Sequence, residues 1–375
     1  MLLPTNRPSC TKFLQALALI SLLTPISGFQ LFGKQLGNII GAEQQARRTT
    51  SSPTTSRIEY QQQQQDAEYQ QDLDELFQAQ KDSHKTKPKL VPLSCDPIML
   101  TTSEPLLTQE ECNLVSDFVE FMAAATYEPD EEFDGNIADI QKGADLLSKV
   151  RDQIDELTGC PTHAGEKPIP QYVVYEPKDA REGGGPPTRR ELMTYGLHVD
   201  TNNGEDLRHL TCLLYLNNNK KGATNFPLVR PYDGTKKISS NKSNRLMRLR
   251  QAAGRLIQSD VQHTAANEVQ DLDIVEELEQ AAVDLYFSDE TQRGDTAMGL
   301  RVLPSAGHVC IFTSLDDEGK PDPSTFHGGE ALIGSDDQKK ILTFFKEVPR
   351  EEFSNDREFA EWVRQKKEYL LDRYF

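Results

Sequence analysis

The chain has 375 residues, enough for two average domains or for one large domain with tails. Only 37% of the residues are hydrophobic and the mean hydropathy is −0.60, so part of the sequence is expected to lie outside any packed core. The formal charge of −18 argues against a surface that binds nucleic acid or an anionic membrane, because such surfaces need dense Lys and Arg side chains.

The first 28 residues have the pattern of a targeting segment. Arg7 and Lys12 precede an apolar run over 13–23 that is followed by small residues. This run is too short to span a bilayer comfortably, so a cleaved secretory signal is the first interpretation and an uncleaved signal anchor is the alternative. Both predict a place in the secretory pathway, in the lumen of the endoplasmic reticulum or Golgi. Phe29 and its neighbours also resemble plastid entry signals, which is a minor alternative.

Residues 29–90 are polar and repetitive, with a glutamine run over 61–65. Such a segment cannot bury enough apolar surface to offset the entropy lost on ordering, so we predict a disordered, Gln-rich stem.

The cysteines show no C-x-x-C pair, which argues against a thiolate metal site. In an oxidising lumen Cys95 could form a disulfide with Cys112 or Cys160, and half-buried thiols are the alternative.

Folded character begins near 91. Thr108 and Glu111 form a capping-box pattern before a helical apolar stripe, and a second stripe over 140–157 ends at Gly159. Short β-rich runs follow, at 171–175, 193–199, 210–216, 309–312 and 341–348. Helices followed by strands predict an α+β fold, with helices packed on a β-sandwich or jelly roll.

A polar, helix-prone block over 236–290 interrupts the predicted strands. We interpret it as an insertion that decorates the fold, with a lid or partner surface as the alternative, and expect metal binding to survive its deletion. Residues 350–375 are predicted to form a C-terminal helix.

The triplet His198-Val199-Asp200 ends an apolar strand, where alternation sends its first and third side chains to the same side. A second histidine from a distant strand would complete a set of two imidazoles and one carboxylate, which suits iron with open coordination positions. His327 precedes Gly328-Gly329, where backbone and ligands can approach closely, and is the favoured third ligand. His308 opens a strand and is expected to be structural.

The triplet belongs to an ordered series of short motifs. They are 195–200, Arg208, Thr211, 215–217, 222–227, 301–304, Gly307, Phe312 and 327–329. Over about 92–349 the series resembles the catalytic domains of the prolyl 4-hydroxylase family. The resemblance implies a double-stranded β-helix (jelly-roll) core with supporting N-terminal helices, in a domain spanning 91–349. It also implies Fe(2+) held by His198, Asp200 and His327, with 2-oxoglutarate as cosubstrate and ascorbate as reductant.

A late lysine fits this chemistry, because 2-oxoglutarate carries a second carboxylate that needs a buried cation. Lys339 is favoured over Lys340, since an aromatic residue, Phe345, stands six positions after it as is common in the family. Thr224 and Tyr195 are expected to donate hydrogen bonds in the same pocket.

The sequence therefore predicts a 2-oxoglutarate- and Fe(II)-dependent dioxygenase that hydroxylates a C–H bond, releasing succinate and CO2. By resemblance, the partners are dioxygen and a peptide or protein that contains proline; no nucleic acid is expected, and a membrane only if the N-terminal signal stays uncleaved. The alternatives are a dioxygenase with a non-prolyl substrate, a catalytically silent relative that acts as a binding module, and a non-oxygenase metal enzyme.

Overall fold

The computed structural model describes residues 89–127, 136–178, 197–200, 206–234, 244–260, 268–287, 299–333 and 337–375. The predicted targeting segment and almost all of the predicted stem lie outside these residues. The chain divides into two compact units. Of the first, the structure describes 117–127 and 136–145, which are helical from 137 onward in the second range. The second, Pro88–Ser116 with Leu146–Phe375, contains all the described strands and the candidate site.

The second unit is built on a six-stranded sheet in which all neighbouring strands are antiparallel. In spatial order the strands are β1 (Leu90–Cys95), β2 (Ile98–Thr102), β8 (Val309–Thr313), β5 (Asp206–Tyr215), β11 (Lys339–Pro349) and β3 (Gln171–Tyr175). Every residue of β8 is buried, as expected for the apolar run VCIFT in the interior of a sheet that is covered on both faces.

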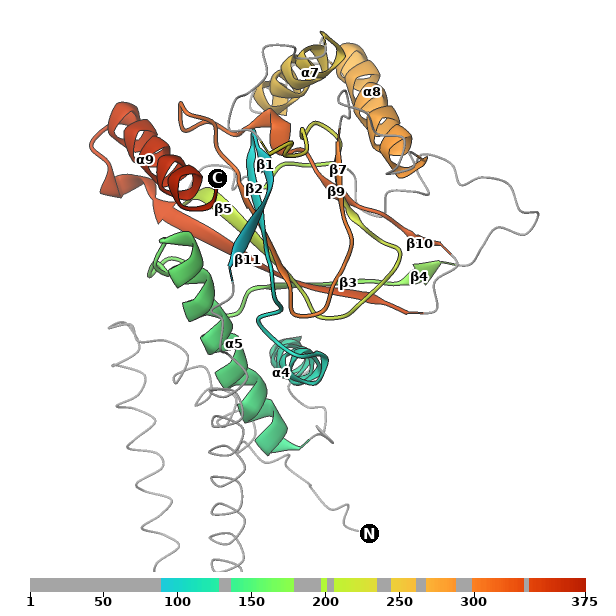
Figure 1. The fold of residues 1–375 in the computed structure, drawn as a ribbon, viewed down its shortest axis with the longest axis vertical. Coiled ribbons are helices and arrows are strands. Elements are labelled where there is room, and N and C mark those ends of the chain that lie inside the picture. Colours follow the sequence, from blue (N-terminus) through green and yellow to red (C-terminus); the bar gives the residue numbers. More distant parts are fainter. Residues whose placement is uncertain are drawn as a thin grey trace, which may run out of the picture. The chain divides into compact units, whose positions relative to one another are not determined.

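A second antiparallel sheet faces the first (Figure 1). It consists of β7 (Leu300–Val302), β6 (Thr224–Phe226) and β9 (Gly328–Gly329). Phe226 of this sheet packs in one core cluster with Leu213, Phe312 and Ile341 of the larger sheet. Two short strands, β4 (Pro177–Lys178) and β10 (Leu332–Ile333), pair in parallel. The prediction of helices combined with antiparallel sheets in a sandwich-like core is therefore confirmed.

The helices begin and end where the sequence indicates. The predicted capping box at α4 (Gln109–Tyr127) is confirmed: the Thr108 N–H donates to the Glu111 carboxylate at 2.7 Å, and the Glu111 N–H donates to the Thr108 hydroxyl at 3.2 Å. Helix α5 (Ile137–Thr158) ends before Gly159, whose φ of +64° lies in the left-handed region that favours glycine.

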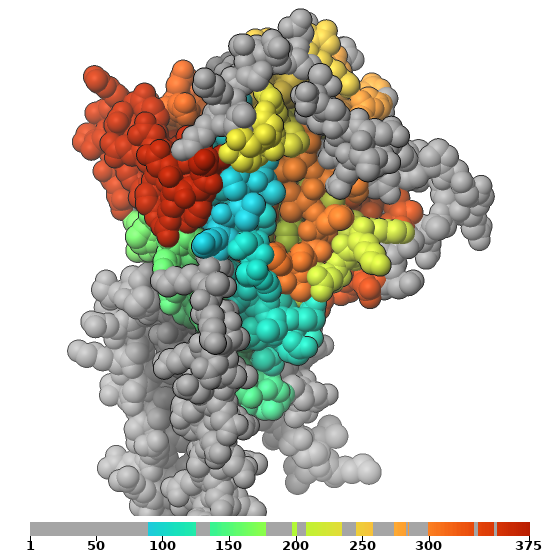
Figure 2. Space-filling model, viewed as in Figure 1, coloured from blue at the N-terminus to red at the C-terminus, as the bar shows by residue number. Residues whose placement is uncertain are grey.

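The predicted C-terminal helix is α9 (Asp356–Tyr374), which follows the short 3-10 helix η3 (Arg350–Glu352). Asn355 caps it by accepting hydrogen bonds from the Arg357 and Glu358 N–H groups. Its apolar side buries Phe359 and Val363, and the helix packs beside β1 and β2 (Figure 2). No helix among the described residues is both long and apolar enough to cross a membrane.

Two helices, α7 (Asn244–Asp260) and α8 (Glu268–Phe287), lie between β6 and β7 in the chain and pack side by side (Figure 1). All five cysteines in the described part of the chain are unbridged thiols, so the disulfides considered for Cys95 are absent from the structure.

Candidate metal centre

His198 and His327 are neighbours although 129 positions separate them in the sequence. They form an isolated antiparallel bridge, in which the His198 N–H donates to the His327 carbonyl at 3.0 Å and the His327 N–H donates to the His198 carbonyl at 2.9 Å. Alternation along 197–200 places Asp200 on the same side as His198.

The loop before His327 is fixed by its own sequence. Asp322 caps the short 3-10 helix η2 (Pro323–Thr325) by accepting a hydrogen bond from the Ser324 N–H, and Pro323 opens the helix. This turn delivers His327 to the start of β9. The glycines behind it allow the close approach that the sequence suggested, because a Cβ atom on Gly329 would lie 2.2 Å from the Tyr175 ring.

The three predicted ligand side chains converge. Asp200 Oδ1 lies 3.5 Å from His198 Nε2, and Asp200 Oδ2 lies 3.5 Å from His327 Nε2. One ligand atom from each residue lies within 4.8 Å of the other two, and no other group of three metal-ligating side chains is this close among the described residues. The arrangement can hold a single metal ion.

The hydrogen bonds of His327 show that these atoms suit a cation. His327 Nδ1 lies 2.9 Å from the Thr325 carbonyl, which can only accept, so Nδ1 carries the proton and Nε2 presents a lone pair. Nε2 therefore faces a second acceptor, Asp200 Oδ2, which is buried and has no hydrogen-bond partner in the described part of the structure. A metal ion between the two atoms would satisfy both.

The protonation states also fit metal binding. Burial raises the pKa of Asp200, but the imidazoles of His327 and His198 outweigh it and lower that pKa to about 2. Burial lowers the pKa of His327, opposed by the Asp200 carboxylate. A charged carboxylate and a neutral imidazole are the forms that ligate divalent metals.

The three candidate ligands differ in exposure. The side chain of His198 is 50% exposed, whereas those of Asp200 and His327 are buried. Phe226 stacks on the His327 ring at a centroid distance of 5.2 Å, and the edge of Phe312 meets it at 5.0 Å. These contacts fix the orientation of His327.

A cavity of about 580 Å³ adjoins the three side chains, which is a usual size for a small-molecule site. Ile341, Thr343 and Phe345 line it from β11, alternating along the strand as a pleated sheet requires. Tyr175 lines it from β3 and Thr224 from β6.

Lys339 and Lys340 point to opposite sides of β11. The side chain of Lys340 is half-buried, and its Nζ donates to the Ser116 hydroxyl at 3.2 Å. Lys339 is fully buried; its Nζ lies 4.4 Å from the centre of the Tyr175 ring and has no hydrogen-bond partner among the described residues. Burial lowers the pKa of Lys339 to about 7, although the Glu330 carboxylate opposes this shift. Lys339 is thus a buried amine without a hydrogen-bonded anion, and an anion that reached it would favour its charged form.

Thr224 and Tyr195 are the hydrogen-bond donors that the sequence predicts for this pocket, and the structure describes only the first. Thr224 is buried, and its hydroxyl lies 3.0 Å from the hydroxyl of Tyr215. The sequence placed Tyr215 in the motif series but gave it no role in the pocket, although its alternation with Leu213 on β5 points it to the same face. Tyr195 lies outside the described residues.

The other described histidines have structural contacts. His308 Nδ1 lies 3.0 Å from the Thr102 carbonyl, in accord with the structural role expected for it. His209 is buried, with Nε2 3.3 Å from the Cys160 thiol.

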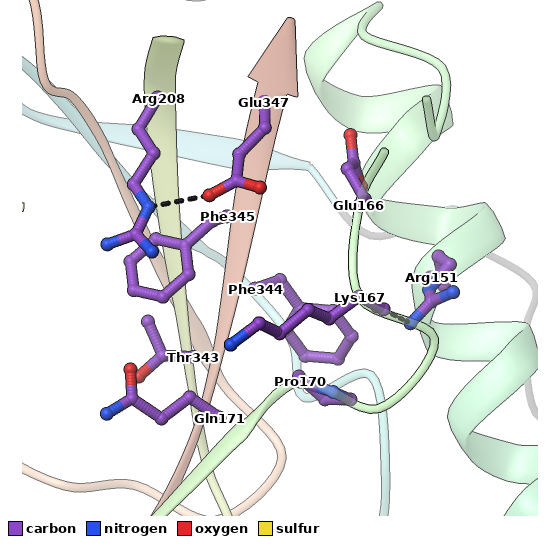
Figure 3. Close-up of a pocket in the computed structure, with 10 residues that line it drawn as sticks. All are labelled: Arg151, Glu166, Lys167, Pro170, Gln171, Arg208, Thr343, Phe344, Phe345 and Glu347. Carbon is purple, nitrogen blue, oxygen red and sulfur yellow. Dashed lines mark hydrogen bonds and ion pairs between the residues drawn. The ribbon is translucent and has the colours of Figure 1, made fainter. Parts of the chain in front are cut away.

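A smaller pocket adjoins the cavity further along β11 (Figure 3). Gln171, Thr343 and Phe345 line both. In the smaller pocket, Arg208 Nε donates to the Glu347 carboxylate at 2.6 Å and its guanidinium lies 3.7 Å above the Phe345 ring. The Arg208–Glu347 pair thus closes the polar end of the cavity wall.

Helices α7 and α8 pack directly behind the candidate ligands. Leu249 of α7 and Leu278 of α8 share a core cluster with Phe326, which precedes His327, and with Leu197 and Val199, which flank His198. This packing argues against the expectation that metal binding would survive deletion of 236–290.

Arg250 of α7 adds polar contacts to this packing. Its guanidinium donates to the Leu228 carbonyl and forms an ion pair with Asp96 at 2.8 Å. These contacts tie α7 to the segments that follow β6 and β1.

Similarity to known proteins is weak. Neither a scan against protein-family models nor a search of curated proteins finds a match. Among solved structures, a truncated viral collagen prolyl hydroxylase from Paramecium bursaria Chlorella virus-1 matches with 14% identity over 68% of this chain and 92% of that chain, at a TM-score of 0.32. The structure of that enzyme with 2OG matches with 14% identity over 66% and 94%, at 0.28. AviO1 from Streptomyces viridochromogenes matches with 10% identity over 66% and 89%, at 0.30.

Proposed function

We propose that this chain is an Fe(II)- and 2-oxoglutarate-dependent dioxygenase that hydroxylates a C–H bond. The observation that carries the proposal is the convergence of His198, Asp200 and His327 on one point at the wall of a cavity, with a buried acceptor atom that lacks a partner. Two imidazoles and one carboxylate on one face suit a non-haem iron centre that keeps positions open for other ligands.

The buried Lys339 supports 2-oxoglutarate as the cosubstrate. An unbonded ammonium in a dry site is costly unless an anion reaches it. The carboxylate of 2-oxoglutarate remote from the metal would supply that anion. The Thr224 hydroxyl lines the cavity and can donate a hydrogen bond there, and the Tyr215 hydroxyl contacts it at 3.0 Å.

When bound, iron and 2-oxoglutarate supply the activation of dioxygen that hydroxylates a substrate and releases succinate and CO2. The residues of the chain have supporting tasks. Phe226 and Phe312 hold the His327 ring in place, the Thr325 carbonyl fixes its proton on Nδ1, and Leu213 and Ile341 give the cavity an apolar wall that limits water.

We further propose a peptidyl proline as the substrate, ascorbate as the reductant and the secretory pathway as the location. The resemblance of the motif series over 92–349 to prolyl 4-hydroxylases supports the substrate and the reductant, and the pattern of the first 28 residues supports the location. The two facing antiparallel sheets support a double-stranded β-helix as the finer description of the core. The cavity of about 580 Å³ that adjoins the three candidate ligands offers room for a substrate side chain.

Incubation of the purified chain with Fe(II), 2-oxoglutarate, ascorbate and proline-rich peptides tests the proposal. We expect succinate, together with a peptide mass gain of one oxygen located on proline. Succinate without a modified peptide would retain the dioxygenase and reject the prolyl substrate. Succinate formed equally by Asp200→Ala would reject the metal site, and no succinate with any peptide would favour a silent binding protein.

A further inference from the structure

Glu330 is a buried carboxylate whose oxygen atoms are already engaged. Arg301 donates to it twice, from Nε to Oε1 at 2.7 Å and from Nη2 to Oε2 at 2.8 Å. The Ala223 N–H also donates to Oε2 at 3.1 Å, and the Glu330 N–H returns a bond to the Ala223 carbonyl at 2.9 Å. Glu330 is 1% exposed, so a planar, bidentate ion pair is fixed inside the protein.

The Glu330 carboxylate affects Lys339 electrostatically without forming a hydrogen bond to it. The Glu330 charge acts on the Lys339 ammonium and raises its pKa against the effect of burial, yet the two groups form no hydrogen bond or ion pair. The two residues lie in one region, because a Cβ atom on Gly222 would lie 3.3 Å from Lys339 Cδ and the next residue, Ala223, donates to Glu330. Buried, opposite charges in one region would ordinarily pair, because an unpaired ammonium in a dry site is unfavourable. The hydrogen bonds from Arg301 and from the Ala223 N–H keep the Glu330 carboxylate away from the Lys339 ammonium.

The backbone explains how Glu330 is restrained. Arg301 stands on β7 and pairs across the sheet with Asn225 of β6, while Ala223 directly precedes β6 and Glu330 directly follows β9. Arg301, Ala223 and Glu330 thus all lie in the smaller sheet or directly beside its strands. Lys339 comes from the larger sheet, at the start of β11.

We propose that Arg301 is a positioning residue of the cosubstrate site, which restrains Glu330 so that the Lys339 ammonium stays available to the remote carboxylate of a 2-oxo dicarboxylic acid. The inference rests on the proposed function. It gives the Arg301–Glu330 pair a task in selecting a dicarboxylic over a monocarboxylic 2-oxo acid. Without Arg301, Glu330 would turn to Lys339 and compete with the cosubstrate.

Binding of two probes to the Mn(II)-loaded protein tests this. The probes are 2-oxoglutarate and 2-oxopentanoate, which has the same carbon chain without the remote carboxylate. We expect the unaltered protein to prefer 2-oxoglutarate by on the order of a hundredfold. Arg301→Met should reduce this preference about tenfold or more, because the freed Glu330 carboxylate would pair with the Lys339 ammonium in place of the ligand. Binding of 2-oxopentanoate should change little.

The double variant Arg301→Met/Glu330→Gln distinguishes competition between Glu330 and the ligand for Lys339 from a general loss of structure at the site. Removing the competing charge should restore most of the preference, whereas a merely structural role for Arg301 predicts no recovery. If Arg301→Met does not fold, Arg301→Lys, which keeps a single ion pair, should show a smaller loss of preference that Glu330→Gln again reverses. An unchanged preference in the single variant, or no recovery in the double, overturns the inference. No preference in the unaltered protein would instead reject the proposed cosubstrate.

Discussion

His198 and His327 are held together by their own backbones, each donating its N–H to the carbonyl of the other at 3.0 and 2.9 Å. The pairing brings their rings to a centroid distance of 4.5 Å and turns both Nε2 atoms toward Asp200. The spacing of the candidate ligands is therefore set by strand pairing rather than by flexible side chains, as a preorganised metal site requires.

The first prediction concerns the three candidate ligands. Replacing His198, Asp200 or His327 by Ala should abolish iron-dependent turnover, because each change removes one of only three protein ligands. Measuring bound Fe(II) and succinate formation checks this. His308→Ala is the matched control, since its ring contacts the Thr102 carbonyl instead of the site, and it should remain active. Activity in the His327 variant with loss in the His308 variant would contradict the assignment.

The second prediction separates two adjacent lysines. Lys339→Ala should raise the Kd for 2-oxoglutarate several hundredfold, since loss of a buried charge partner costs about 3–5 kcal/mol. Iron affinity should hardly change. Lys340→Ala is the control, because that side chain points away and bonds to Ser116. Titrating 2-oxoglutarate under saturating metal decides the matter, and a large effect in the Lys340 variant would refute the placement.

The third prediction follows from the pKa of Lys339, which burial lowers to about 7 in the free protein. A bound carboxylate favours the charged ammonium and raises that pKa. At a pH between the pKa of Lys339 in the free protein and its pKa in the complex, binding of 2-oxoglutarate therefore takes up a proton. The affinity for 2-oxoglutarate should be highest below pH 7 and fall as the pH rises, by up to about tenfold per unit. Calorimetry at pH 8 in two buffers of different ionisation enthalpy measures the proton uptake. Uptake that persists in Lys339→Ala would show that another group titrates.

The fourth prediction concerns the helices behind the ligands. Leu249→Ala in α7 should weaken Mn(II) binding about tenfold, because its cluster includes the residues that flank His198 and His327. Leu370→Ala in α9 is the control: both leucines are buried, and either change should cost about 2–5 kcal/mol of stability. Equal Mn(II) affinity in both variants, at similar thermal stability, would show that α7 contributes to stability and not to metal binding. Deletion of 236–290 should likewise impair metal binding.

Much of the site could be predicted because its signals are local. Alternation in the His198-Val199-Asp200 triplet gives the first two candidate ligands, and alternation on β11 implies that only one of Lys339 and Lys340 can face inward. The capping box and Gly159 mark helix ends in the same way, through contacts between near neighbours.

What the sequence could not reveal depends on pairs far apart in the chain. The Arg301–Glu330 ion pair joins segments from different parts of the chain. Arg301 belongs to the motif series, but nothing in the sequence identifies Glu330 as its partner. The packing of the insertion against the candidate ligand segments was not expected, for a related reason. Its polar composition concealed the narrow stripe formed by Leu246, Leu249 and Ala253, whose partner surface becomes visible only when 197–200 and Phe326 are brought together.

The central claim is that His198, Asp200 and His327 hold iron in a cavity that also takes 2-oxoglutarate. Anaerobic titration of the Fe(II)-loaded chain with 2-oxoglutarate, followed by visible absorption, tests it most directly, because chelation of the metal by a 2-oxo acid produces a charge-transfer band. We predict that the band appears in the unaltered protein and in His308→Ala, and that it is absent from Asp200→Ala. No band in the unaltered protein, or an equal band in Asp200→Ala, would contradict the account.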